Sequence, residues 1–286
     1  MGKFDGVLLC SDFDNTLIYT EAALLGGGEL PPLSHGNRQA IEYFMAEGGI
    51  FSVATGRALP SFAPIVPMLP MNGPSILFNG AAIYDFKTES YLATAFLPDD
   101  IREKLMPVEE AFPGLTCEIY HDSSDIHILH PNELTFNHMR LTDSSAVEVE
   151  SIRQVPFPIS KVLFEETGER SLALEKYIRG QSWAEEYEIV RTGKFFLEIT
   201  AKGATKGHMV RVLAERLHIR RENVCCIGDF YNDIPMLRYA GHAFAPGNAA
   251  LEVRQLPGVT VLRDSREDAV AELIGRLDGI FPRKEG

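Results

Sequence analysis

The chain has 286 residues, of which 45% are hydrophobic, and it carries a formal net charge of −13 at neutral pH. This length allows two domains, and this hydrophobic fraction is that of a globular protein with a full core. The negative charge disfavours nucleic acid and anionic membrane surfaces as partners, although local cations can still bind a small phosphorylated ligand.

The first predicted element is a buried strand from Val7 to Ser11, followed by Asp12 and Asp14. An apolar run stopped by polar residues is typical of a parallel sheet, whose ligands bind beyond the carboxyl ends of the strands. Strand alternation places both carboxylates on one side, where their repulsion requires a proton or a bound cation. The alternative is an ordinary Asp-rich turn.

Two further apolar runs, 50–54 and 75–78, predict buried strands, and a helical pattern after Ser34 separates them from the first strand. Both runs end in polar residues that are candidates for a site: Thr55, Arg57, Asn79 and Gly80. This alternation predicts an α/β fold with a doubly wound, mainly parallel, Rossmann-like core sheet.

From about residue 84 the pattern changes to strand-like runs mixed with helical stretches near 99–112 and 169–180. The strand-like runs are 116–120, 126–129, 159–164 and 187–191. We interpret 84–192 as an inserted α+β domain, which divides a core made of 1–83 and 193–286. The run from Phe195 to Thr200 is expected to resume the core pattern.

A second acidic cluster follows the apolar run 224–227 and contains Asp229, Asn232 and Asp233. Carboxylates at two strand ends of one sheet predict a site with four carboxylates, which suits a hard divalent cation, Mg²⁺ before Zn²⁺. The histidines His121, His127 and His130 of the insert have only a loose metal spacing, and surface or strand-face positions are favoured for them.

Four motifs in this order resemble those of the haloacid dehalogenase-like (HAD) phosphatases, and most closely their Cof-type branch. They are Asp12-x-Asp14-x-Thr16, Thr55-Gly56-Arg57, Lys206 at a helix start, and Gly228-Asp229-x-x-Asn232-Asp233. Additional matches are Asn79-Gly80-Ala81, Lys202-Gly203 and Pro246-Gly247-Asn248-Ala249. The resemblance covers essentially the whole chain, and it implies that the insert 84–192 is a cap domain and that 1–83 and 193–286 form the catalytic core. Asn15 stands where the family usually has Gly, and Asn is also suited to a left-handed turn.

The resemblance implies a role for each motif residue. Asp12 would be the nucleophile, Asp14 a general acid and base with a raised pKa, Thr55 a phosphoryl-binding group and Lys206 a transition-state cation. The Mg²⁺ ion would be held by Asp12, the Asp14 backbone and Asp229, with Asp233 binding it directly or orienting its shell. Expected substrate contacts come from Arg57, Asn79, Gly80, Asn232 and Asn248, although each of these could instead cap a turn or make a structural contact.

The expected function is therefore a Mg²⁺-dependent phosphatase of small phosphorylated metabolites, with sugar phosphates as the favoured class, acting through an aspartyl-phosphate. The alternatives are a phosphomutase or phosphotransferase with the same chemistry, and a non-catalytic binding protein. Cysteines inside apolar runs, with no signal peptide or membrane span, predict a reduced, cytoplasmic protein. We expect a monomer or homodimer without nucleic acid or membrane partners.

Overall fold

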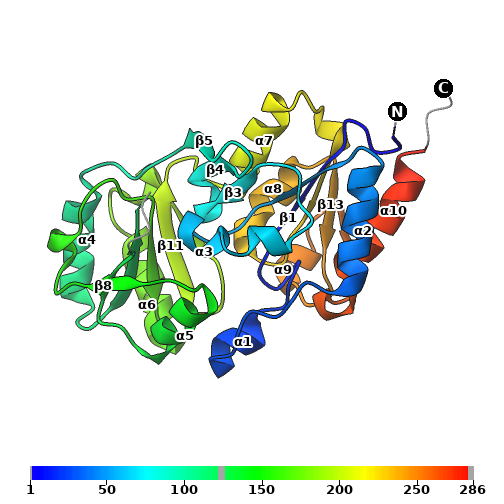
Figure 1. Cartoon of the computed structure of the whole chain (residues 1–286). Coiled ribbons are helices and arrows are strands. Elements are labelled where there is room, and N and C mark those ends of the chain that lie inside the picture. The colour runs from blue at the N-terminus through cyan, green and yellow to red at the C-terminus, as the bar shows by residue number, and fades with distance from the viewer. Residues whose placement is uncertain (1, 122–125, 283–286) are drawn as a thin grey trace.

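The computed structural model describes residues 2–121 and 126–282, which form two sheet-based units joined side by side (Figure 1). The first unit contains a five-stranded parallel sheet of order β14-β13-β12-β1-β2. Its strands are β1 (Leu8–Ser11), β2 (Ile50–Val53), β12 (Val224–Ile227), β13 (His242–Ala245) and β14 (Val259–Val261). We call this unit the core.

Helices cover both faces of the core sheet, because alternate strand residues point to opposite sides. On one face, Leu9 packs in a cluster with residues of α2 (His35–Ala46) and α10 (Ala269–Ile280), which lie side by side in Figure 1. On the other face, Leu8 packs with residues of α7 (Lys206–Arg216) and α8 (Ile234–Tyr239). The doubly wound α/β prediction is confirmed.

The second unit contains a six-stranded, mostly antiparallel sheet of order β10-β11-β9-β6-β7-β8. Its strands are β6 (Thr116–Tyr120), β7 (Ile126–Leu129), β8 (Ala146–Glu148), β9 (Lys161–Glu165), β10 (Tyr187–Arg191) and β11 (Phe196–Ala201). Helices α4 (Ile101–Ala111) and α6 (Gly168–Arg179) bury the apolar face of this sheet. Helix α5 (Glu133–Leu141) contacts the opposite face, which carries buried charged residues. We call this unit the cap.

A small antiparallel sheet connects the two units and contains β3 (Ser75–Leu77), β4 (Ala82–Asp85) and β5 (Ser90–Thr94). A parallel bridge between Ala54 and Ile76 links it to the end of β2. The remaining helices are α1 (Glu21–Gly26), α3 (Leu59–Phe62) and α9 (Leu251–Arg254). The 3₁₀ turns are η1 (Val66–Met68), η2 (Phe78–Gly80), η3 (Ile152–Gln154), η4 (Ala184–Glu186), η5 (Arg221–Asn223), η6 (Tyr231–Asp233) and η7 (Ser265–Glu267).

Two segments of the chain lie elsewhere than the sequence analysis expected. The strand at 196–201, expected in the core, is β11 and pairs antiparallel with β9 and β10 in the cap. Residues 84–94 of the β4–β5 hairpin, expected in the insert, pack on the core, where Arg216 donates a 2.7 Å hydrogen bond to the Leu92 carbonyl. We therefore propose limits for the cap near residues 97 and 201.

All four cysteines are buried thiols. Cys10, Cys225 and Cys226 lie on the adjacent strands β1 and β12 of the core sheet, whereas Cys117 lies on β6 of the cap. In the described part of the chain, no helix has the length and apolar character needed to cross a bilayer.

Candidate active site

Three neighbouring strands of the core sheet bring the predicted site residues to one edge. Strands β12, β1 and β2 run parallel, with Ile227, Ser11 and Val53 in register at their carboxyl ends. The residues that follow these ends are Asp229, Asp12 and Thr55, and all three are buried.

Lys206 connects the two acidic motifs. Its Nζ lies 2.5 Å from Asp12 Oδ1 and 2.7 Å from Asp233 Oδ1, and its side chain is fully buried. It is the first residue of α7, which begins after Thr205, whose side chain accepts a hydrogen bond from the His208 N–H. The helix N-terminus therefore adds partial positive charge at the same point.

Gly80 determines how closely the start of α7 approaches the site. Its φ is +105°, and a Cβ placed there would lie 2.3 Å from the Thr205 carbonyl carbon. A side chain at this position would displace Thr205 and, with it, Lys206. Gly80 therefore allows the close approach of α7 through its backbone. The structure supports this positioning role and not the substrate contact that the sequence analysis expected.

Both carboxylate oxygens of Asp233 accept hydrogen bonds from the protein. Oδ1 faces Lys206, and Oδ2 accepts the backbone N–H groups of Asp229 and Phe230 at 2.9 and 3.0 Å. Asp229 is further held by Thr16, whose hydroxyl donates to Oδ1 at 3.0 Å. This arrangement fits an orienting role for Asp233 better than direct metal binding.

The acidic cluster carries more negative than positive charge. One oxygen each from Asp12, Asp229 and Asp233 lies within 4.8 Å of the others, with Lys206 as the ammonium between two of them. Burial and the charge of Asp233 raise the pKa of Asp12 to about 7, although Lys206 opposes this shift. Burial and the charge of Asp12 raise the pKa of Asp229 well above its usual value. A hard divalent cation fits this oxygen set and relieves the repulsion.

Asp14 is not a member of this cluster and pairs with Arg57. The guanidinium donates to both carboxylate oxygens, from Nη2 at 2.8 Å and Nε at 3.0 Å. Burial acts to raise the pKa of Asp14, but the charge and hydrogen bonds of Arg57 outweigh it and lower the pKa. The expectation of a raised pKa for Asp14 is therefore wrong for this arrangement, because the nearest strong charge is a cation. Three of the four expected carboxylates, those of Asp12, Asp229 and Asp233, therefore lie together at this edge of the sheet.

The other predicted residues form a hydrogen-bonded frame around the site. Thr55 accepts the Arg57 backbone N–H at 3.1 Å, and Asn232 donates to Asn79 Oδ1 at 2.9 Å. Asn248 donates to the Asn15 carbonyl at 2.8 Å. Asn15 has a φ of 60°, so the left-handed turn expected at this position is present.

A cavity of about 280 Å³ lies between core and cap over this edge of the sheet. Six of the predicted residues line it: Asp12, Asp14, Arg57, Asp229, Asn232 and Asn248. The other predicted residues do not line it: Thr55, Asn79, Gly80, Lys206 and Asp233. The cap wall includes Lys161, whose Nζ donates to the Gly56 carbonyl of the core at 2.9 Å.

Comparison with known proteins decides the family. The model of the haloacid dehalogenase-like hydrolases matches residues 9–274. The chain belongs to the HAD-like hydrolases. It is an enzyme of their phosphatase type, and its order of motifs and cap is that of the Cof-type branch.

The relatives of this HAD-like hydrolase agree over its whole length. It is 27% identical over 276 residues to an HMP-PP phosphatase of Serratia proteamaculans, covering 93% of both chains. A haloacid dehalogenase-like hydrolase from Bacteroides thetaiotaomicron superposes with a TM-score of 0.78 at 23% identity, over 95% of this chain and 99% of the other. A HAD subclass IIB sugar phosphatase gives a TM-score of 0.79 at 21% identity, over 95% and 98% of the two chains. The two structural comparisons support the shared fold.

Sequence reasoning missed the charged residues that the cap of this HAD-like hydrolase brings to the cavity. Lys161 and Glu198 form a buried ion pair at 3.2 Å, and Glu198 also accepts a hydrogen bond from Asn79 of the core. The buried Glu118 and Glu165 form a second group in the cap with the partly buried His138. A signal was present, because a charged residue inside a predicted buried strand requires a partner.

Proposed function

We propose that this HAD-like hydrolase is a Mg²⁺-dependent phosphatase of small phosphorylated metabolites that forms an aspartyl-phosphate on Asp12. The observation that carries the proposal is the buried contact of Asp12 with Lys206, beside Asp229 and at the floor of a cavity. The carboxylates of Asp12 and Asp229 and the Asp14 backbone carbonyl would hold the cation. Bound Mg²⁺ would neutralise charge on the phosphoryl oxygens and so let an anionic nucleophile approach.

The proposed reaction has two steps. The Asp12 carboxylate attacks phosphorus, and the bond to the leaving alcohol breaks as the acyl-phosphate bond forms. Water then attacks the phosphorus of the aspartyl-phosphate, which restores Asp12 and releases inorganic phosphate. In both steps Lys206 would stabilise charge that develops on the phosphoryl group, while Asp233 holds the ammonium in place.

Asp14 would supply a proton to the leaving alcohol and later accept one from water. Its pairing with Arg57 is a resting arrangement, because a carboxylate with a lowered pKa is a poor proton donor. We propose that Arg57 turns toward the bound anionic substrate. Loss of this cation, together with the approach of negative charge, would raise the pKa of Asp14 when it must act as an acid.

The size and lining of the cavity support a small metabolite as the substrate. Its volume is near the lower end of the roughly 300–1,000 Å³ range of small-molecule sites. Its walls combine charged groups such as Lys161 with the aromatic residues Tyr19 and Phe196, which suits a polar body with one apolar face. A sugar phosphate has this chemistry, and one structural neighbour is a sugar phosphatase.

The proposal is tested by incubating the purified protein with phosphorylated metabolites and Mg²⁺ and measuring released phosphate. Asp12→Asn should lower kcat by on the order of 10³-fold or more, because the covalent route is lost. Asp99→Asn, an exposed matched control, should keep wild-type activity. Turnover of Asp12→Asn within tenfold of wild type would contradict the nucleophile assignment. Transfer of phosphate to an added sugar in preference to water would instead indicate a phosphotransferase.

A further inference from the structure

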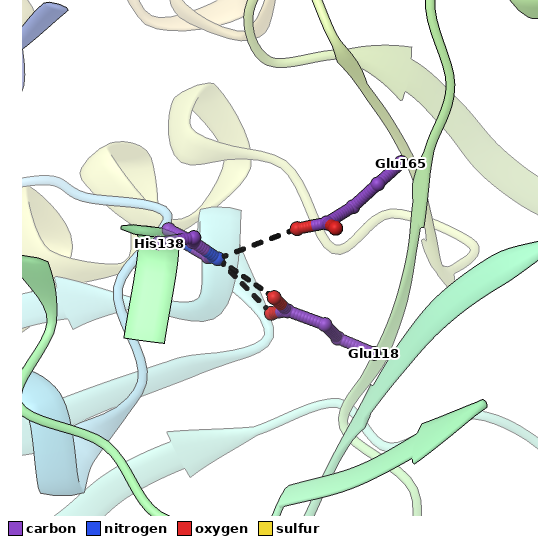
Figure 2. A group of neighbouring side chains, drawn as sticks. All are labelled: Glu118, His138 and Glu165. Atoms are coloured by element: carbon purple, nitrogen blue, oxygen red, sulfur yellow. Dashed lines mark hydrogen bonds and ion pairs between the residues drawn. The ribbon is translucent and has the colours of Figure 1, made fainter. Parts of the chain in front are cut away.

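A group of ionisable side chains lies inside the cap, apart from the proposed reaction. Figure 2 shows Glu118 and Glu165 from the cap sheet and His138 from α5 directed toward a common point. His138 Nδ1 lies 2.9 Å from Glu118 Oε1 and 3.9 Å from Glu165 Oε1. The two glutamate side chains are 1% and 0% exposed and His138 is 16% exposed.

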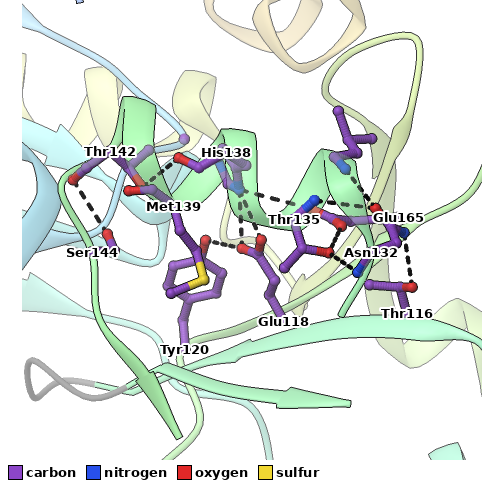
Figure 3. A network of polar contacts seen from close by, with 12 residues as sticks. Thr116, Glu118, Tyr120, Asn132, Thr135, His138, Met139, Thr142, Ser144 and Glu165 are labelled. Carbon is purple, nitrogen blue, oxygen red and sulfur yellow. Dashed lines mark hydrogen bonds and ion pairs between the residues drawn. The ribbon is translucent and has the colours of Figure 1, made fainter. Parts of the chain in front are cut away.

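One carboxylate oxygen of each glutamate accepts a hydrogen bond from a neighbouring hydroxyl group. Tyr120 donates to Glu118 Oε2, and Thr135 donates to Glu165 Oε2 at 2.5 Å (Figure 3). Glu165 Oε1 accepts no hydrogen bond from any residue of the described chain, although it is fully buried. His138 Nδ1 lies within hydrogen-bond distance of both Glu118 oxygens, at 2.9 and 3.1 Å, so Glu165 Oε1 is the unpartnered atom beside this pair.

The groups that hold these oxygens are themselves fixed. Asn132 begins α5 with a capping box, in which its side chain accepts from the Thr135 backbone and the Thr135 hydroxyl accepts from the Asn132 backbone. The Asn132 side chain also donates to the Thr116 hydroxyl on β6. A rigid outer layer of this kind is what orients the ligands of a metal ion.

The two glutamates bring negative charge into a buried space, because one oxygen of each lies within 4.8 Å of the other and of a His138 ring nitrogen. Two carboxylates at such close range in a buried site require a proton or a cation between them.

We propose that Glu118, His138 and Glu165 form a second metal site, for a borderline divalent cation such as Zn²⁺. An imidazole ligand favours Zn²⁺ over Mg²⁺, which prefers oxygen ligands alone. Bonds of about 2.0–2.1 Å in a tetrahedral shell place ligand atoms about 3.3 Å apart. The distances of 2.9 and 3.9 Å from His138 Nδ1 to the glutamate oxygens lie on either side of this value.

The position of the site gives it a structural consequence and an entry route. His138 lines the cavity, so an ion reaches the group from the cavity side. The ion would join α5 to strands β6 and β9 of the cap sheet. Helix α5 ends at Leu141, whose carbonyl oxygen lies 3.4 Å from Arg57 Nη1 of the core, so the ion would also stiffen the cap wall that faces Arg57.

The test is zinc binding to the metal-free full chain, measured by equilibrium dialysis and zinc X-ray absorption. The proposed active-site metal site has only oxygen donors, so the scattering signature of a bound imidazole identifies the cap site. Wild type should bind zinc with this signature. Glu165→Gln keeps the size of the side chain and an acceptor for Thr135, and should lose the signature with about 100-fold weaker binding. Glu169→Gln, on the exposed face of α6, should bind as wild type does.

Three results would overturn the proposal. They are wild-type protein that takes up no imidazole-bound zinc, unchanged binding and signature in Glu165→Gln, and a shared proton as the sole occupant of the group. Circular dichroism checks that each variant is folded, and His138→Gln provides a second ligand deletion that should also remove the signature. A rise in Tm with zinc in wild type and Glu169→Gln, absent from Glu165→Gln, would support the structural role independently of enzyme activity.

Discussion

Replacement of Lys206 by methionine tests whether its ammonium stabilises the buried carboxylates of Asp12 and Asp233. Methionine keeps much of the length and apolar stem of lysine, so the change mainly removes the positive charge. It leaves Asp12 and Asp233 buried without their common partner, beside Asp229. We expect the metal-free protein to be strongly destabilised.

The magnitude follows from the two contact distances. At an effective dielectric constant of about 20, an ion pair at 2.5 or 2.7 Å contributes roughly 6 kcal/mol of attraction. Much of this attraction offsets the cost of burying the charges. Removal of one partner from a buried pair typically costs about 3–5 kcal/mol of unfolding free energy.

The assay is urea unfolding in the presence of a chelator, for wild type, Lys206→Met, Asp12→Asn and the double variant. Because the single changes disrupt the same contact, the double variant should be more stable than the sum of the two losses predicts, by about 2 kcal/mol or more. Lys202→Met is the matched control, since Lys202 is 61% exposed and 3.7 Å from its partner Glu188. Its cost should stay below about 0.5 kcal/mol.

Additive losses within about 0.5 kcal/mol would refute the reasoning, because the charge of Lys206 would then not act through Asp12. A loss in Lys206→Met no larger than that in Lys202→Met would refute it as well. Mg²⁺ provides a further check, since a divalent cation should stabilise Lys206→Met more than wild type if both cations balance the same carboxylates.

Three further predictions concern the backbone, an arginine-bound glutamate and the proposed metal. Gly80→Ala should cost about 2 kcal/mol or more in urea unfolding, because its φ is +105° and its new Cβ would meet Thr205 at 2.3 Å; a loss under 0.5 kcal/mol would contradict this. Hydrogen bonds from Arg179 at 2.9 Å and Arg191 at 2.5 Å lower the pKa of Glu175 against the effect of burial, so this carboxylate stabilises the fold above its unfolded pKa and less as pH falls. Glu175→Gln should therefore cost about 1 kcal/mol at pH 7 and almost nothing near pH 3 by thermal unfolding, and a cost independent of pH would count against the pairing. A chelator should abolish phosphate release, with Mg²⁺ restoring it better than Ca²⁺, and full activity in excess chelator would exclude the proposed active-site metal.

The core sheet and the carboxylates at its edge could be predicted because they follow from local sequence patterns. Apolar runs that end in polar residues define β1 and β12, and parallel strands bring such ends to one edge. Asp12 and Asp229 meet for this reason, without any knowledge of the loops. The helix that starts at Lys206 has an equally local signal, since Thr205 caps it.

The errors arose where a residue's partner is far away in the chain. An apolar strand such as β11 has the same composition in a parallel or an antiparallel sheet, so its sequence did not assign it to the cap. The pKa of Asp14 depends on Arg57, which comes from another strand end. Glu118, His138 and Glu165 come from two strands and a helix, and only the folded cap brings them together.

The buried cysteines can report local opening of the structure, because they lie in both core and cap. Cys10, Cys225 and Cys226 are shielded in the core sheet, and Cys117 is shielded in the cap. A thiol reacts with an alkylating reagent when its surroundings open, so the labelling rate of each cysteine follows the opening of its own unit. Mass spectrometry of labelled peptides would thus measure the opening free energies of cap and core separately within one unmodified chain.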